Sequence, residues 1–221
     1  MLYFLLRISS HIQSFVCATP ALNISSPRLF RTYMVRENRS YNCPIWQAAR
    51  ATSAAPTFFK RIQIGDKGSE EEFIDGGLGC NNPVKQVLEE AEAAFGSNQY
   101  VACIISIGSG QPGVVGLKSP DAFQKALPLD LIPVLRQIAT DCESAAEDIE
   151  KRFKSIPNLY FRFNVEQGMQ GVTLAEGGKL GEVTQHTMQY IQKLAVGERI
   201  NAAVKAIRAQ KAVVRSIELS M

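Results

Sequence analysis

The segment that most constrains the fold is Phe-Ile-Asp-Gly-Gly-Leu-Gly-Cys-Asn-Asn-Pro, at residues 73–83. Its apolar start predicts the end of a buried strand, which leads directly into Asp75. Gly76 and Gly77 follow, and Pro83 is typical of the first position of a helix. A carboxylate at the tip of a strand, next to glycines that leave room for an approaching molecule, is placed as a catalytic base would be. The alternative is that Asp75 only caps the Gly-Gly turn.

Length and composition predict a globular protein with one domain, to which a helical annex can be added. The chain has 221 residues, of which 46% are hydrophobic, so it can bury a core. The net charge of +3 is too small to indicate a nucleic-acid partner. Residues 151–154 (Lys-Arg-Phe-Lys) are the densest basic cluster, and we interpret them as the solvated face of a helix.

The five cysteines are spread along the chain without a C-x-x-C pair. This spacing predicts neither a zinc site nor a disulfide framework, and it favours reduced thiols in an intracellular protein. The apolar run at residues 1–6 ends at Arg7 and is too short for a secretion signal. No run of about 20 apolar residues is present to span a membrane. We therefore expect a cytoplasmic, non-secreted protein, and peripheral binding to a membrane surface stays open.

Strand and helix patterns alternate along the chain. Strands are predicted at residues 14–18, 28–35, 72–75, 100–107 and 160–163, and helices at residues 45–53, 83–95, 120–156, 179–193 and 197–211. This order predicts the α/β class, with helices on the faces of a sheet. The apolar run at residues 100–107 is typical of a central parallel strand. Asn82 is expected to cap the helix that begins at Pro83.

Several blocks in order resemble the patatin-like phospholipases. Residues 45–59 (Ile-Trp-Gln-Ala-Ala-Arg-Ala-Thr-Ser-Ala-Ala-Pro-Thr-Phe-Phe) resemble a block of that family, and residues 75–77 resemble its catalytic Asp-Gly-Gly motif further along the chain. Residues 81–83 and 104–110 also look like family features. The resemblance covers residues 14–112. Residues 157–165 resemble the tail of the patatin-like domain in large multidomain fungal proteins.

The resemblance implies a three-layer α/β/α sandwich that hydrolyses acyl esters in phospholipids or other acyl lipids. The family uses a Ser-Asp dyad without a metal or organic cofactor. Asp75 would be the base that takes the proton of the serine, in a motif completed by Gly76 and Gly77. No histidine is needed between them, which agrees with the isolated positions of His11 and His186. The resemblance also leaves room for further domains in a full-length protein.

The sequence departs from the family in one respect, because no G-x-S-x-G nucleophile motif occurs in it. Gly108-Ser109-Gly110 is the nearest imitation, but Ile107 occupies the position of the first glycine and the serine follows the aspartate in the wrong order. We therefore predict no nucleophile, no oxyanion loop, and no activity of these residues alone. Whether the chain is an enzyme stays open. The alternative is a non-catalytic lipid-binding or protein-interaction module.

This departure also predicts how the chain is divided. Residues 1–13 are expected to be an atypical N-terminal segment, and residues 14–112 the C-terminal half of a patatin-like catalytic domain. Residues 113–221 are expected to form a mainly helical extension of the same domain. The sandwich would then be incomplete on its N-terminal side, which would leave an open sheet edge and an uncovered apolar face.

Other residues of the family blocks have two interpretations. Arg50 suits either a lipid phosphate or a structural salt bridge in a packed helix. Trp46 and the pair Phe58-Phe59 are interpreted as core rather than as acyl-chain contacts. Asn81 and Asn82 are interpreted as cap and turn residues rather than as substrate ligands.

Overall fold

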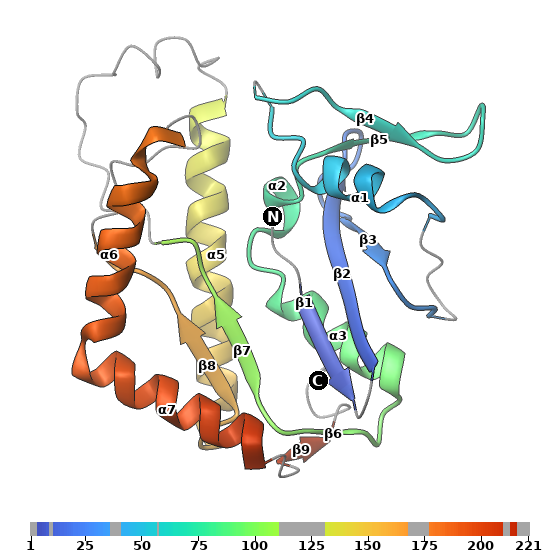
Figure 1. The fold of residues 1–221 in the computed structure, drawn as a ribbon. Coiled ribbons are helices and arrows are strands. Elements are labelled where there is room, and N and C mark those ends of the chain that lie inside the picture. The colour runs from blue at the N-terminus through green and yellow to red at the C-terminus, as the bar shows by residue number, and fades with distance from the viewer. Residues whose placement is uncertain are drawn as a thin grey trace.

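The computed structural model describes residues 4–8, 11–35, 41–56, 58–110, 131–167, 177–209 and 213–215. Its largest sheet has five strands, arranged around the long strand β2 (Figure 1). Their bounds are β1 (Phe4–Ile8), β2 (His11–Pro20), β3 (Arg28–Arg31), β4 (Ile62–Ile64) and β5 (Glu71–Ile74). Strand β2 pairs with β1 and β3 and, through its last two residues, with β5, which also pairs with β4. All four pairings are antiparallel.

Helices cover both faces of this sheet because the side chains of β2 alternate between the two. Val16 and Ala18 face helix α1 (Ile45–Thr52) and join a core cluster with Phe30 and Phe73. Phe15 and Cys17 point to the opposite face, where α2 (Gly77–Cys80) and α3 (Val84–Phe95) lie. The result is a helix–sheet–helix arrangement, so the α/β class predicted from the sequence is confirmed.

A second group of elements packs beside α3. Strands β7 (Ile104–Ile107) and β8 (Tyr160–Phe163) pair in parallel, and α5 (Leu131–Phe153) connects to β8. Strands β6 (Tyr100–Val101) and β9 (Val214–Arg215) form a short antiparallel pair. The core here joins Val84 and Leu88 of α3 to Ile104, Ile149, Phe153, Leu159 and Val214. Turn η1 (Gly177–Lys179) leads into α6 (Leu180–Gln192) and α7 (Leu194–Ala209), which lie at the outer side of this group (Figure 1).

Most of the predicted elements are present, with three corrections. The predicted strand at residues 100–107 is divided into β6 and β7, and it is not central, since Ile105 and Ile107 are exposed. The short helix α2 was not predicted. Asn82 does not cap α3, because the helix begins after Pro83 without a side-chain cap and the Asn82 amide donates instead to the Cys142 carbonyl at 3.0 Å. The part of the predicted helix at residues 120–130 lies outside the described residues.

A buried ion pair fixes α3 to the five-stranded sheet. The Arg31 guanidinium on β3 donates two hydrogen bonds to the Glu90 carboxylate on α3, and the Tyr33 hydroxyl donates a third at 2.7 Å. The side chains of Arg31 and Glu90 are 1% and 7% exposed. Burial lowers the pKa of Arg31, but the hydrogen bond and charge of Glu90 outweigh it and raise that pKa. Arg31 therefore stays charged inside the protein.

Candidate functional site

Asp75 directly follows β5, and the backbone of the Asp-Gly-Gly motif is held by the end of α1. The Asp75 amide donates to the Ala54 carbonyl at 3.1 Å, and the Gly76 amide donates to the Thr52 carbonyl at 3.2 Å. Ala51 and Ala54 are fully buried, so their small side chains let the two segments approach. The two blocks that looked separate in the sequence thus form one unit.

Gly76 is required by close packing rather than by its backbone angles. Its φ of −59° and ψ of −28° are ordinary helical values. A Cβ at this position would lie only 2.1 Å from the Cys17 carbonyl oxygen on β2. The Thr19 hydroxyl also faces the Gly76 carbonyl, at 3.5 Å. The backbone of β2 therefore packs directly against the motif and leaves no room for a side chain at position 76.

The Asp75 carboxylate is half-buried, and its two oxygens have different surroundings. Oδ1 accepts a hydrogen bond from the Gly77 amide at 2.6 Å. A Cβ on Gly77 would lie 2.9 Å from Oδ1, so glycine allows this approach. Within the described part of the chain, Oδ2 receives no hydrogen bond. Burial raises the pKa of Asp75, and the Gly77 hydrogen bond only partly offsets that effect. Oδ1 is thus held in place by the Gly77 amide, while no described residue donates to Oδ2.

The Gly77 bond also shows that Asp75 caps the turn, so the capping and base interpretations are compatible. An aspartate that accepts from the amide two residues on is a common turn arrangement. Here the turn opens directly into α2, where the Cys80 amide donates to the Gly76 carbonyl at 2.8 Å. The cap therefore orients the carboxylate and uses only one of its oxygens.

The prediction that Trp46 and Phe59 belong to the core is wrong. Trp46 is 63% exposed and Phe59 is 58% exposed. Arg50 stands between these two side chains: it is one helical turn from Trp46 on α1, and its guanidinium carbon lies 5.3 Å from the centre of the Phe59 ring. Phe58 is half-buried. Helix α1 buries its small residues and leaves its large ones at the surface.

Among the described residues Arg50 forms no salt bridge, and its other interpretation, contact with a lipid phosphate, stays a prediction. Its Nη2 donates to the Lys60 carbonyl, so it anchors the loop after α1 rather than forming a salt bridge. The Nη1 atom of Arg50 is buried without a hydrogen-bond partner. A buried donor without a hydrogen-bond partner is a costly arrangement.

A polar network links the end of α2 to α5 and β8. Asn82 donates a hydrogen bond to the Cys142 carbonyl, as described above. Next to Cys142, Glu143 Oε1 accepts hydrogen bonds from Arg162 Nη2 at 3.3 Å and from Asn164 Nδ2 at 2.9 Å. Arg162 Nη1 also donates to the Ser106 hydroxyl at 3.0 Å. Asn82 is therefore a structural contact rather than a turn residue alone. Sequence analysis missed this network because its members lie on four separate elements.

The remaining predicted residues are not gathered at Asp75. Ser109 is exposed in the turn after β7, and no hydrogen bond joins it to Asp75. His186 lies on α6, 3.9 Å from Glu182, and the side chain of His11 is outside the described set. Lys151 and Arg152 are exposed on α5, as predicted for a solvated face. Across the described ranges, no group of three or more His, Cys, Asp and Glu side chains is placed to hold a metal.

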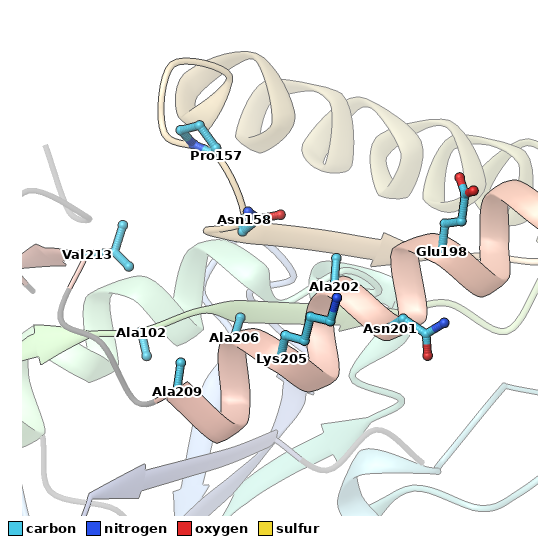
Figure 2. Close-up of a pocket in the computed structure, with 10 residues that line it drawn as sticks. All are labelled: Ala102, Pro157, Asn158, Glu198, Asn201, Ala202, Lys205, Ala206, Ala209 and Val213. Atoms are coloured by element: carbon cyan, nitrogen blue, oxygen red, sulfur yellow. The ribbon is translucent and has the colours of Figure 1, made fainter.

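A pocket of about 670 Å³ lies apart from the motif, between α7 and the strands next to it (Figure 2). Alanines of α7 form much of its wall, with Lys205, Glu198 and Asn201 at its polar side and Asn158 across from them. Asn158 adopts a positive φ of 62° in the turn before β8. No lining residue comes from α1, α2 or β5, so the pocket and the Asp-Gly-Gly motif are separate features.

Comparison with known proteins agrees with this geometry. Residues 7–88 match the family model described as Patatin-like phospholipase. These residues belong to the patatin-like phospholipase family. The match includes β2, α1, β5 and α2, which are the elements that position Asp75, and it begins at Arg7, within the segment expected to be atypical.

Curated relatives are similar at low identity. Patatin-like phospholipase 1 of Plasmodium falciparum is 24% identical over 186 residues, covering 72% of this chain and 27% of the relative. Phospholipase A I of Arabidopsis thaliana is 29% identical over 133 residues, covering 60% and 9%. Calcium-independent phospholipase A2-gamma of Mus musculus is 30% identical over 151 residues, covering 67% and 18%. The chain thus spans about a tenth to a quarter of these proteins. No solved structure matches it.

Proposed function

We propose that this chain carries the catalytic-base part of a lipid acyl-ester hydrolase with a Ser-Asp dyad, in which Asp75 is the base. The observation that carries the proposal is the Asp75 carboxylate, held by the Gly77 amide through Oδ1, while Oδ2 receives no hydrogen bond from the described residues. Its raised pKa makes it a stronger base than an ordinary aspartate. Gly76 and Gly77 serve the site by keeping the space beside the carboxylate free of side chains.

The proposed reaction follows from this placement. A serine hydroxyl within hydrogen-bond reach of Asp75 gives its proton to the carboxylate while its oxygen attacks the ester carbonyl. The protonated aspartate then returns the proton to the leaving alcohol, and an acyl-serine remains. The same carboxylate then takes a proton from water as the water oxygen attacks the acyl-serine, and it returns that proton to the serine oxygen as the fatty acid leaves. The oxyanion donors that such a reaction needs would come from the glycine-rich loop expected of the family.

The substrate is proposed to be a phospholipid or another acyl lipid, as the names of the relatives suggest for those proteins. "Calcium-independent" in one of these names supports hydrolysis that needs no calcium. The 221 residues contain no G-x-S-x-G, so we propose that the serine is supplied from outside them and that they are inactive alone. Residues 14–112 would be the C-terminal half of the catalytic domain and 113–221 its extension, in a cytoplasmic protein that binds membranes peripherally.

The first test is the transcript, sequenced upstream of the codon for Met1. We expect an in-frame segment with a glycine-rich loop and a G-x-S-x-G elbow. Joined to the present residues, it should hydrolyse a nitrophenyl acyl ester and a phospholipid, and Asp75→Asn should abolish both activities. The 221 residues by themselves should hydrolyse neither. Hydrolysis by them that is lost in Asp75→Asn would contradict the assignment of the serine.

A second candidate function is a non-catalytic lipid-binding module, which the exposed surface of α1 favours. Trp46, one helical turn before Arg50, and Phe59, whose ring lies 5.3 Å from the Arg50 guanidinium carbon, are both exposed. Lys60, next to Phe59, is exposed as well. Aromatic rings that flank cationic groups suit the boundary between lipid headgroups and acyl chains.

Trp46 makes this alternative easy to test, because it is the only tryptophan in the chain. Vesicles that contain anionic phospholipid should shift its fluorescence to shorter wavelength and sediment the protein. Phe59→Ala should weaken the binding, whereas Leu194→Ala, which removes an exposed apolar side chain from α7, should leave it unchanged. Equal loss in both variants, or no shift at all, would exclude this surface as a lipid contact.

A further inference from the structure

Two of the five cysteines meet beneath the Asp-Gly-Gly motif. Cys17 lies on β2 and Cys80 ends α2, and their Sγ atoms are 3.4 Å apart although 63 residues separate them. Both are free thiols and both are buried. Sequence spacing gave no indication of this pair.

The surroundings hold the two sulfurs together. Phe15, Leu29, Tyr33 and Val87 pack around them, and Cys80 Sγ also lies 3.2 Å from Gln86 Oε1. Sulfur atoms in a disulfide are about 2.0 Å apart. The observed separation therefore requires a further approach of about 1.4 Å, which side-chain rotation and a small shift of the short helix α2 can supply.

We propose that Cys17 and Cys80 form a reversible disulfide that fixes the Asp-Gly-Gly motif to β2. With hydrogen peroxide as the oxidant, the two thiols lose two electrons and two protons as the S–S bond forms. The O–O bond of the peroxide is cleaved, and two water molecules result. A dithiol such as dithiothreitol reverses the reaction by thiol–disulfide exchange and is itself oxidised. The proposal does not depend on the function proposed above.

The link would act on the motif because of where its two ends lie. The Cys17 carbonyl is the atom that Gly76 packs against, and the Cys80 amide donates to the Gly76 carbonyl. A covalent bond between these two residues would therefore bracket Gly76 and restrain Asp75 beside it. It would also close a long loop, which restricts the unfolded chain and stabilises the folded one.

The groups around Cys17 are expected to slow formation of the disulfide. The Cys80 hydrogen bond and then burial raise the pKa of the Cys17 thiol, so the reactive thiolate is scarce. Formation of the disulfide is expected to be slow with a bulky oxidant and faster with small hydrogen peroxide. The other three cysteines differ from this pair: Cys43, Cys103 and Cys142 are half-buried, and none is hydrogen-bonded to another cysteine in the described part of the chain.

The test maps disulfides in the full 221-residue chain. Reduced native protein is treated with hydrogen peroxide, remaining thiols are alkylated, and the digest is analysed by mass spectrometry. We expect Cys17–Cys80 as the main cross-link, with Cys43, Cys103 and Cys142 alkylated. In concentrated guanidinium chloride, pairs closer in sequence should form instead. If the native chain formed Cys17–Cys80 no more often than the denatured chain, the proposal would be overturned.

The effect of the disulfide on the Asp-Gly-Gly motif is measured separately, by melting temperature and amide exchange. Oxidised protein should melt several degrees higher than reduced protein, and amide exchange at residues 75–80 should slow at least tenfold. Cys80→Ser should lose both effects and Cys103→Ser should keep them. Where Cys80→Ser is too unstable to purify, Cys17→Ala takes its place, and the native-against-denatured mapping of the unsubstituted chain needs no variant. A cross-link without slower exchange at residues 75–80 would overturn the proposed action on the motif.

Discussion

The two groups of elements in this molecule are built in different ways. Around Asp75, segments contact each other through their backbones: Gly76 against the Cys17 carbonyl, and Asp75 and Gly76 hydrogen-bonded to the end of α1. Around β8, long side chains make the connection, with Arg162, Glu143 and Asn164 in one network. Contact between backbones requires glycine or alanine at fixed positions, whereas long side chains reach across a gap in several ways. The first kind of packing leaves a recognisable motif in the sequence, and the second does not.

The outer helices extend this contrast. Helix α6 has no fully buried residue, and α7 buries only Ala203. Both expose large apolar side chains, among them Leu180, Met188 and Leu194. The family match, by comparison, ends at residue 88, within α3. The part of the chain that carries the match therefore also contains the close backbone contacts at Gly76.

The largest effect is expected for Glu90→Gln, which tests the buried ion pair between Arg31 and Glu90. The substitution keeps the shape but removes the negative charge of Glu90 from beside the buried Arg31 guanidinium, so the free energy of unfolding should fall by about 3 kcal/mol. Urea unfolding measures this. Asp148→Asn is the control, since its pair with Lys85 is exposed and should change stability by less than about 1 kcal/mol. Similar effects of both would show that burial of the pair does not matter.

The second-largest effect is expected for Gly76→Ala, which should lower the free energy of unfolding by about 3 kcal/mol or slightly less. The new methyl group would overlap the Cys17 carbonyl, which as backbone of β2 cannot turn aside. Gly197→Ala is the matched control in the other region, because nothing lies within 4 Å of its Cβ position in α7. That change should stabilise the protein by about 0.5 kcal/mol, since alanine favours a helix over glycine. The comparison fails if the two substitutions act in the same direction.

Glu143→Ala tests the side-chain network of α5 and β8. It should lower the free energy of unfolding by about 2 kcal/mol, because Arg162 and Asn164 lose a hydrogen-bond acceptor in a partly buried place. Glu147→Ala, one turn further along α5, removes only an exposed pair with Lys151 and should change stability by less than about 0.5 kcal/mol. Urea unfolding again decides. We expect Glu143→Ala to leave the amide exchange of residues 75–80 unchanged, and faster exchange there would show that the two regions are coupled.

The smallest change is expected for Asp75→Asn, and its sign depends on pH. The pKa of Asp75 is raised in the folded protein, so folding favours the protonated carboxyl. The stability that the Asp75 carboxyl contributes is fully present below its pKa in the unfolded chain, and it is lost as the pH rises through its pKa in the folded protein. Asp75→Asn should therefore be slightly more stable than the unsubstituted chain at neutral pH, and the difference should vanish in acid. Lower stability of the variant at neutral pH would mean that the charged carboxylate stabilises the fold.

Sequence reasoning predicted best what depends on local pattern. The strand at residues 160–163 and the helices near residues 45–52 and 84–95 were found because their periodicity is contained within the segment. The α/β class and the position of Asp75 after a strand followed in the same way. None of this required knowledge of distant contacts.

What was missed depends on distant partners. The pairing of Thr19 with Ile74 and the meeting of Cys17 with Cys80 cannot be read from spacing, because strand partners are set by the whole fold. Trp46 and Phe59 were assigned to the core on residue type alone, but α1 packs through Ala51 instead. None of the described helices is long and apolar enough to cross a membrane.

The central place of β2 has a consequence for how this molecule assembles. Strand β2 is synthesised before its partner β5 and the motif, since Thr19 and Gly76 are 57 positions apart in the sequence. Contacts between such distant segments form slowly, because a long loop must close before they are gained. A growing polypeptide thus exposes the apolar faces of β2 until β5 arrives. Asp75 takes up its position among the last steps of this process, so a mutation that slows the pairing of β2 with β5 would lower the yield of correctly formed sites without touching any residue near the carboxylate.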